Sequence, residues 1–257
     1  MRFYDLDIDV KNYAKRIVDA GYKCPADINS VSDFVKGLKI INAWQNITEI
    51  FLMRSNQNAG AGTTIYGLKK SNATMNSAVW QPNGVKITTT NTQTITLFNS
   101  FSCPSLISVA LVSNQYNDDG GDLLYSIAIG SDRAGLFLNS HWAAQARYFG
   151  CVPANPLSNY SCGQYSLQNG IYNDNSRKFI TFQRLAENTY PSIHRDGTIQ
   201  NGGTDGSNIR SFREVTISNV SITKNGEYAL YVFADSIDLN NIRSIYKATA
   251  GKGLGLP

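Results

Sequence analysis

The chain has 257 residues, of which only 16% are charged, and 23 basic against 19 acidic side chains leave a formal net charge of +4. The basic residues are scattered, and no Lys/Arg run is dense enough to neutralise several phosphates, so we do not expect nucleic acid as a partner. No apolar run approaches membrane-spanning length and the acidic N-terminus lacks the basic region of a signal peptide, so we expect neither a membrane partner nor a secretory address.

Two amphipathic helices are predicted near the N-terminus. Apolar side chains recur at helical spacing over residues 9–20, with Asp9 as the expected N-cap and Gly21 as the stop. A second apolar stripe begins after Pro25, a favoured first helical position, and continues to Leu38. Both stripes need an apolar surface to pack against.

A third helix is predicted after Asn42, its expected cap, and ends near Arg54. It aligns Trp44 with apolar side chains one and two turns later. Trp44 and Trp80 are interpreted as core anchors where the helices meet the rest of the protein.

Residues 55–62 are rich in Asn, Gly and Ala, a composition typical of a linker. Helical periodicity largely disappears beyond them. We therefore predict a helical docking and assembly segment at residues 1–60 and a β domain at residues 61–257.

Short runs rich in Val, Ile, Thr, Phe and Tyr fill the predicted β domain, separated by turns such as Asn83-Gly84 and Asp196-Gly197. Their number and spacing favour a sandwich or jelly roll. A short helix after Asp238, its expected cap, follows the last strand, and the tail from Gly251 is either flexible or docked elsewhere. The expected strands are residues 85–90, 92–98, 106–113, 123–130, 134–140, 178–185, 213–220 and 227–234.

The order of these motifs resembles proteins of tailed-phage and prophage genomes that join a short N-terminal helical segment to a concanavalin A-like (laminin G-like) jelly roll. The resemblance covers nearly the whole chain. It implies a mainly β protein: a concanavalin A-like jelly-roll sandwich preceded by a small helical segment and closed by a short C-terminal helix. The motifs that carry it are Gly67-Leu68-Lys69, Trp80, Asn83-Gly84-Val85, His194-Arg195-Asp196-Gly197 and the run from Tyr228 to Ala234.

The same resemblance implies a bacteriophage virion structural protein in a tail, fibre or other surface position, with a lectin-like domain that contributes to host attachment. Expected partners are other virion proteins, sister subunits in a homotrimer and a host surface glycan. A capsid decoration, cement or tail-bracing protein without a ligand stays open as an alternative, and a glycan hydrolase is a third.

No catalytic motif stands out, and we expect no enzymatic activity. Retaining glucanases of this fold need two carboxylates close together on one strand, and none of the four glutamates has a carboxylate two residues away. The two histidines, His141 and His194, are far apart in sequence and are interpreted as structural.

Two clusters of acidic residues could hold a cation. A tight loop carries Asp118, Asp119 and Asp122, which suit the oxygen ligands of calcium, although a plain β-turn explains them too. Calcium is the one cofactor considered. The alternating acids from Asp5 to Asp9 are interpreted as solvated residues at a helix N-terminus, with a cation site as the alternative.

A ligand site is predicted in residues 141–175, where aromatic rings for sugar stacking lie near hydrogen-bonding side chains. Packed core contacts and an ordered covering loop are the alternatives. Free thiols are expected at the four cysteines, although Cys151 and Cys162 could cross-link under oxidising conditions. The predicted ligand-binding residues are His141, Trp142, Gln145, Arg147, Tyr148, Tyr160, Tyr165 and Tyr172.

Overall fold

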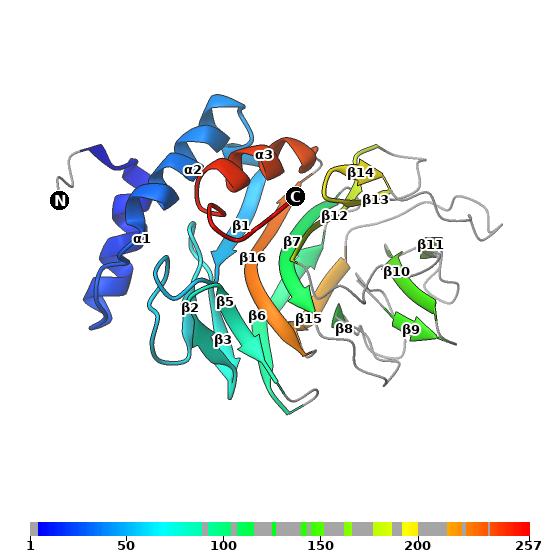
Figure 1. Ribbon diagram of the computed structural model, residues 1–257, viewed down its shortest axis with the longest axis horizontal. Coiled ribbons are helices and arrows are strands. Elements are labelled where there is room, and N and C mark those ends of the chain that lie inside the picture. Colours follow the sequence, from blue (N-terminus) through cyan, green and yellow to red (C-terminus); the bar gives the residue numbers. More distant parts are fainter. Residues whose placement is uncertain are drawn as a thin grey trace.

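The computed structural model consists mainly of antiparallel strands, with helices near both ends of the chain (Figure 1). The helices are α1 (Ile8–Asp19), α2 (Ile28–Ile40), the 3-10 helix η2 (Trp44–Asn46) and α3 (Asn240–Ala248). The structure describes residues 5–88, 92–103, 107–115, 125–126, 140–142, 145–151, 162–165, 177–186, 192–199, 215–222, 225–235 and 237–257.

The described strands form two larger sheets and one small one. An eight-stranded sheet has the order β14-β13-β12-β7-β16-β5-β4, with β1 also paired to β16. A five-stranded sheet has the order β2-β3-β6-β15-β8, and a three-stranded sheet the order β11-β10-β9. The strands are β1 (Ile47–Leu52), β2 (Thr64–Tyr66), β3 (Asn72–Asn76), β4 (Val79–Gln81), β5 (Gly84–Ile87), β6 (Thr94–Cys103), β7 (Ile107–Gln115), β8 (Tyr125–Ser126), β9 (Ser140–Trp142), β10 (Gln145–Cys151), β11 (Cys162–Tyr165), β12 (Lys178–Arg184), β13 (Ser192–Arg195), β14 (Thr198–Ile199), β15 (Val215–Ile222) and β16 (Gly226–Asp235).

Strand β16 lies in the middle of the eight-stranded sheet and is buried on both faces. Leu230, Val232 and Ala234 belong to the hydrophobic cluster that contains the inner faces of α1, α2 and α3. Tyr231 and Phe233 alternate with them and therefore point to the opposite side of the sheet. An uninterrupted apolar run, rather than an alternating one, is what a strand covered on both faces requires.

The opposite side of β16 faces the five-stranded sheet. Phe98 of β6 packs edge-on against Phe51 of β1 and Phe233 of β16, with ring centroids 5.6 and 4.8 Å apart. Aromatic pairs at these separations add to the stability gained from burial alone. The two sheets are therefore packed face to face, which confirms the predicted fold class: a β-sandwich preceded by a short helical segment and closed by a C-terminal helix.

The predicted third helix is wrong. Trp44–Asn46 form only a 3-10 turn, and Ile47–Leu52 form β1, which pairs antiparallel with β16. Apolar residues at positions 47, 50 and 51 suit a helix stripe, but they also suit a strand that is covered on both faces. The unpaired edge of β16 decides between them because it supplies backbone partners that an isolated helix would lack.

The starts of the first two helices are also corrected. The N-cap of α1 is Asp7, whose side chain accepts a hydrogen bond from the backbone N–H of Asp9 at 2.9 Å, so Asp9 lies within the helix. Helix α2 begins at Ile28, three residues after Pro25. The predicted apolar stripes are confirmed, since Tyr13, Phe34 and their neighbours on the same faces are buried.

The two predicted tryptophan anchors differ. Trp44 is partly buried and packs against the hydrophobic cluster beside the helices. Trp80 does not belong to that cluster, and the prediction of a core anchor is wrong there. It lies in β4 at the end of the eight-stranded sheet, half-buried, and its indole N–H donates to the carbonyl of Gly62 at 3.0 Å.

Both hairpin turns predicted from Gly are confirmed. Pro82-Asn83 connects β4 to β5, and Asp196-Gly197 connects β13 to β14 with φ values of +52° and +87°. These positive values explain the residue types at the second turn, because Asp and Gly tolerate the left-handed region.

The C-terminal tail is docked. Leu254 and Leu256 are buried in the same hydrophobic cluster as the helices, and Arg54 donates to the carbonyl oxygens of Ala250 and Lys252 at 2.9 and 3.1 Å. One cluster thus contains residues of α1, α2, β1, β16, α3 and the tail. The division at residues 60 and 61 stays a prediction, and β1 places part of the first segment within the main sheet.

Candidate functional site

Six of the predicted ligand-binding residues lie in the small sheet β11-β10-β9. The strands pair without a register shift, so each described residue has a defined register partner on the neighbouring strand. These residues are close together in the sequence, and the pairing of the three strands keeps them close in the fold. They are His141 and Trp142 in β9, Gln145, Arg147 and Tyr148 in β10, and Tyr165 in β11.

The register divides them into two groups. Gln145 is opposite Trp142, so these two share a face with Arg147, two positions along β10. Tyr148 is opposite Tyr165, and both share the other face with His141. The register therefore assigns Trp142, Gln145 and Arg147 to one face and His141, Tyr148 and Tyr165 to the other.

The remaining predicted site residues lie outside the described part of the chain. These are Tyr160 and Tyr172, and the three calcium candidates Asp118, Asp119 and Asp122. Among the residues that the structure describes, no group of three His, Cys, Asp or Glu side chains could hold a metal ion. The calcium site stays a prediction.

The cysteine predictions are tested only in part. Cys151 in β10 is the register partner of Cys162 in β11, so the backbone brings together the two residues considered for a cross-link. The cross-link itself stays a prediction. Cys24 is a free thiol, and burial raises its pKa, which keeps it protonated and unreactive at neutral pH.

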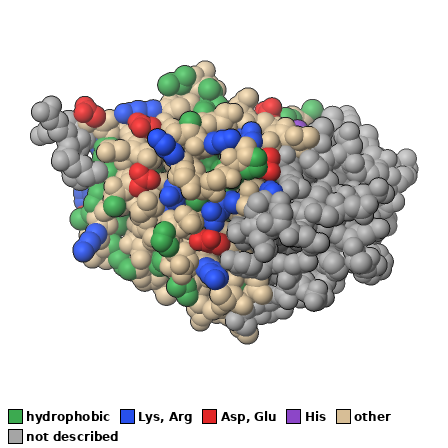
Figure 2. Space-filling model, in the orientation of Figure 1, with side chains coloured by type: hydrophobic (Ala, Val, Ile, Leu, Met, Phe, Trp, Pro, Cys, Tyr) green, Lys and Arg blue, Asp and Glu red, His purple; other side chains and the backbone are tan. Residues whose placement is uncertain are grey.

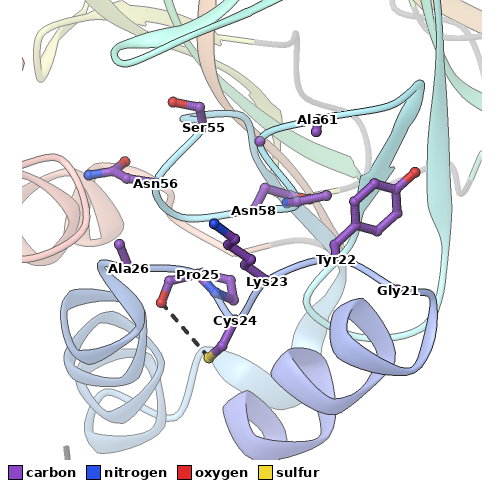
Figure 3. A pocket seen from close by; sticks show the side chains of 12 residues that line it. Gly21, Tyr22, Lys23, Cys24, Pro25, Ala26, Ser55, Asn56, Asn58 and Ala61 are labelled. Atoms are coloured by element: carbon purple, nitrogen blue, oxygen red, sulfur yellow. Dashed lines mark hydrogen bonds between the residues drawn. The ribbon is translucent and has the colours of Figure 1, made fainter.

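The described part of the chain also contains an open pocket that sequence reasoning missed. It has a volume of about 580 Å³ and lies between the α1–α2 connection and the loop that follows β1 (Figure 3). A volume of this size is ordinary for a small-ligand site. Its walls are Gly21, Tyr22, Lys23, Cys24, Pro25 and Ala26 on one side and Ser55, Asn56, Asn58, Ala59, Gly60 and Ala61 on the other.

Buried amides hold the loop of this pocket in place. The Asn58 side chain is 1% exposed; its Nδ2 donates to the carbonyls of Leu52 and Tyr66 at 2.7 and 2.9 Å. Its Oδ1 accepts from the N–H groups of Ala59 and Tyr66 at 2.9 and 3.0 Å. One amide therefore makes the four hydrogen bonds it is capable of, and the loop is tied to both β1 and β2.

Gln57 ties the same loop to other elements. Its Nε2 donates to Asp27 Oδ2 and to the carbonyl of Ala250 at 2.8 and 2.7 Å, and the backbone carbonyl of Gln57 accepts from the Tyr13 hydroxyl at 2.7 Å. The N–H of Asp27 donates to the carbonyl of Asn56 at 2.8 Å, which joins the two walls of the pocket. The pocket is therefore preformed.

Tyr22 and Lys23 provide the functional groups at its rim. In Figure 3 both side chains rise from the helix connection towards the opposite loop, whereas Cys24 points away from it. The Tyr22 ring is fixed by an edge-on contact with Tyr66, with centroids 6.2 Å apart. Lys23 is exposed.

A second polar cluster surrounds His194 in β13. Its Nε2 lies 3.1 Å from Ser192 Oγ and its Nδ1 lies 3.2 Å from Asn240 Nδ2, an arrangement that looks like a nucleophile, a base and an orienting group. Asp238 Oδ1 accepts from the Asn240 side chain and backbone N–H groups, both at 2.9 Å. That acceptor turns the Asn240 amide so that Nδ2 faces the histidine ring.

This orientation gives His194 a structural role. Asn240 Nδ2 faces Nδ1 and Gln183 Nε2 lies 3.4 Å from Nε2, so an amide contacts the ring at each nitrogen and holds it in place. The Ser192 hydroxyl lies 3.5 Å from the carbonyl of Gln183, its acceptor. Burial lowers the pKa of His194, against the opposing charge of Asp238, which agrees with a neutral ring.

Glu49 is the most deeply buried acid in the described residues, at 0% exposure. Its Oε1 accepts from the N–H groups of Ile50 and Lys69 at 3.0 and 2.8 Å. Its Oε2 accepts from Lys70 and Ser71 at 2.9 and 2.6 Å. Four backbone donors hold the carboxylate, so it stabilises the turn between β2 and β3.

The acids at the start of α1 are paired with a lysine. Lys39 Nζ lies 2.8 Å from Asp7 Oδ1 and 2.6 Å from Asp9 Oδ2. Burial opposes the charged form of Lys39, but hydrogen bonds to the two carboxylates raise its pKa overall. The position at a helix N-terminus is confirmed, but Asp7 is mostly buried and paired with Lys39, so the interpretation as solvated acids is wrong for it.

The described surface mixes both signs of charge. On the face shown in Figure 2, basic and acidic side chains are interspersed among neutral polar groups. Within the described ranges, no helix combines the length and the apolar character needed to cross a membrane.

Comparison with known proteins supports the fold of this chain but assigns it to no family. No family model matches the chain, and no curated protein matches it either. Among solved structures, it is similar to Trypanosoma rangeli sialidase in complex with sialic acid, with a TM-score of 0.50 and 11% identity over 82% of this chain and 34% of the sialidase. It is also similar to the receptor binding domain of botulinum neurotoxin D, with a TM-score of 0.50 and 9% identity over 79% of this chain and 52% of that one.

These likenesses support the β-sandwich architecture alone, because the identities are about one residue in ten. The chain spans about a third of the sialidase and about half of the toxin domain. The resemblance to phage and prophage proteins stays a prediction, which these two structures do not test.

Proposed function

We propose that this protein is a non-enzymatic virion component of a tailed phage or prophage that contributes to host attachment by binding a surface glycan. The observation that carries the proposal is the register of β9 and β10, which puts Trp142, Gln145 and Arg147 on one face of a small sheet. An aromatic residue beside hydrogen-bonding side chains is the combination that sugar recognition requires.

Two further observations support this proposal. The similar structures include a receptor binding domain of a toxin and a sialidase solved with sialic acid, so sandwiches of this kind occur in proteins that meet glycans or receptors. The hydrogen bonds that hold the His194 ring on both sides support a structural role for the Ser192–His194 pair. Fold analogy alone does not assign a function, so the register of the small sheet carries the argument.

The mechanism is multivalent attachment. Trp142 stacks on a sugar ring while Gln145 and Arg147 bind its hydroxyl or acidic groups, and each such contact is weak. Several copies on a symmetric particle, with a homotrimer as the proposed unit, raise the avidity through effective concentration. Other virion proteins hold these copies on the particle.

Binding of the purified full chain to host surface polysaccharide tests the site. We expect Trp142→Ala and Arg147→Gln each to weaken binding by about tenfold, equivalent to about 1.4 kcal/mol. Ala146→Ser changes the opposite face of the same sheet and serves as the matched control, with an expected change below twofold. Equal losses from all three variants, or no binding by the unmodified protein, would contradict the proposed site.

A phage that lacks the gene tests the virion role. We expect adsorption to fall while particle stability is unchanged. Loss of particle stability with normal adsorption would instead favour the decoration, cement or tail-bracing alternative. Release of new reducing ends from host polysaccharide by the purified protein would favour the hydrolase alternative and overturn the non-enzymatic assignment.

A further inference from the structure

The pocket between the α1–α2 connection and residues 55–61 has walls that buried amides hold in place. Asn58 and Gln57, at 1% and 0% exposure, direct their amide groups to six backbone or side-chain partners to fix a surface loop. A site whose walls are already ordered binds a ligand without an entropic cost for arranging the loop. This makes the pocket suited to a small, weakly held ligand.

The charge of the pocket restricts its ligand. None of the residues that line it is an acid, and Lys23 is the one charged lining residue. Within the described ranges, Lys23 Nζ makes no ion pair and the Tyr22 hydroxyl makes no hydrogen bond. The rim therefore offers one cationic donor and one neutral donor that the protein itself leaves unused, which disfavours a cation and favours an anionic ligand.

The other residues of the pocket indicate which kind of molecule bears the negative charge. The Tyr22 ring stands at the rim, where it makes an edge-on contact with Tyr66, and the polar residues Ser55 and Asn56 belong to the opposite wall. An aromatic surface with neutral hydrogen-bonding groups suits a ring that bears hydroxyl groups. A simple anion such as acetate would use Lys23 alone.

We infer that this pocket binds a hexose unit that carries a carboxylate, with the carboxylate at Lys23 and the sugar ring beside Tyr22. This goes beyond the proposed function, because it adds a second saccharide site formed by the helix connection and independent of the β9–β10–β11 sheet. An acidic polysaccharide could then engage one copy of the protein at two places.

Titration of the full chain with sodium glucuronate, glucose and sodium acetate, followed by NMR or calorimetry at low salt, tests the inference. We expect glucuronate to bind about three- to fivefold more tightly than glucose, since an exposed ion pair contributes up to about 1 kcal/mol. Acetate should bind more weakly than either sugar.

Four variants locate the site. Lys23→Gln should reduce glucuronate affinity to that of glucose, and Lys247→Gln, which removes the same charge from the exposed surface of α3, should leave it unchanged. Tyr22→Phe keeps the ring contact with Tyr66 and should weaken both sugars modestly. Ala61→Trp fills the pocket from an exposed position and should abolish both, with an unchanged circular dichroism spectrum as the folding control.

Each other outcome overturns the inference. Equal affinity for glucose and glucuronate would remove the role of Lys23, and equal affinity for acetate would reduce the site to general anion binding. Binding that survives Ala61→Trp would lie elsewhere. Binding that is lost in Trp142→Ala would belong to the β9–β10–β11 sheet, and that variant separates failure of this inference from failure of the proposed function.

Discussion

Two loops on either side of β2 are both held by buried side chains, but by groups of different charge. The turn at residues 67–71 is bound by the carboxylate of Glu49, which accepts four backbone hydrogen bonds. The loop at residues 55–61 is bound by the neutral amides of Gln57 and Asn58. Both devices satisfy backbone groups that would otherwise lack partners.

The two loops differ in the contacts that nearby basic side chains make. Near Glu49, Arg16 donates to the carbonyls of Gly67 and Lys70, and Lys69 Nζ donates to the carbonyl of Trp44 while lying 4.8 Å from the centre of its ring. Near the amides, Lys23 has no such partner within the described residues. Arg54 shares the Ala250 carbonyl with Gln57, so Lys23, exposed at the rim, is the basic residue that differs from those near Glu49.

Removal of the Glu49 carboxylate should have the largest effect. Glu49→Ala leaves the N–H groups of residues 50 and 69–71 without their acceptor, and we expect the free energy of unfolding to fall by about 3–5 kcal/mol in urea denaturation. Glu49→Gln keeps one carbonyl acceptor and should lose less. A loss below about 1 kcal/mol for Glu49→Ala would show that water satisfies the turn equally well.

Removal of the Asn58 amide should have the second largest effect. Asn58→Ala loses four hydrogen bonds of a neutral group, so we expect a decrease of about 2–4 kcal/mol in the free energy of unfolding. Asn72→Ala changes an exposed asparagine in β3 and serves as the control, with an expected change within about 0.5 kcal/mol. If the two variants were equally stable, the loop would not depend on its buried amide.

The two lysines test the difference between the loops directly. Lys69→Gln removes a contact with the Trp44 ring and a donor to its carbonyl, and we expect a loss of about 1 kcal/mol. Lys23→Gln should change the free energy of unfolding by less than about 0.5 kcal/mol, because the protein makes no use of that charge. A loss for Lys23→Gln as large as that for Lys69→Gln would remove the distinction between a structural and an available cation.

The smallest expected effect on stability is the one that depends on the protonation of His194. Because burial lowers its pKa, the unfolded chain binds a proton first as the pH falls. Stability from the neutral ring is present above about pH 6.5, the usual value, and is lost as the pH falls through the lowered pKa. Thermal unfolding should therefore show a larger drop in Tm between about pH 8 and about pH 5 in the unmodified protein than in His194→Gln.

The contrary result for His194 is equally clear. A steeper acid-induced drop in the variant would mean that the protonated ring is stabilised in the folded protein, by Asp238 for example. The neutral ring inferred from burial would then be wrong, and the structural role of the Ser192–His194 pair would need revision.

The candidate sites were predictable to different degrees. The residues of the β9–β10–β11 sheet were found from sequence because they are neighbours along the chain and include several aromatics. The pocket was not, because its walls are formed by segments about thirty residues apart and joined by the hydrogen bond from Asp27 to Asn56. Gln57 and Asn58 lie in a segment whose composition is typical of a linker, and only the structure shows that they are buried.

The sequence by itself determined the fold class, the apolar faces of α1 and α2, the Asn83 and Asp196 turns and the central strand β16, since periodicity and turn chemistry are local properties. Tertiary structure decided that Ile47–Leu52 form a strand, that Trp80 lies at an edge, and that residues 55–61 line a preformed pocket. These outcomes depend on which backbone groups and side chains meet across long sequence distances, and composition and spacing do not record that.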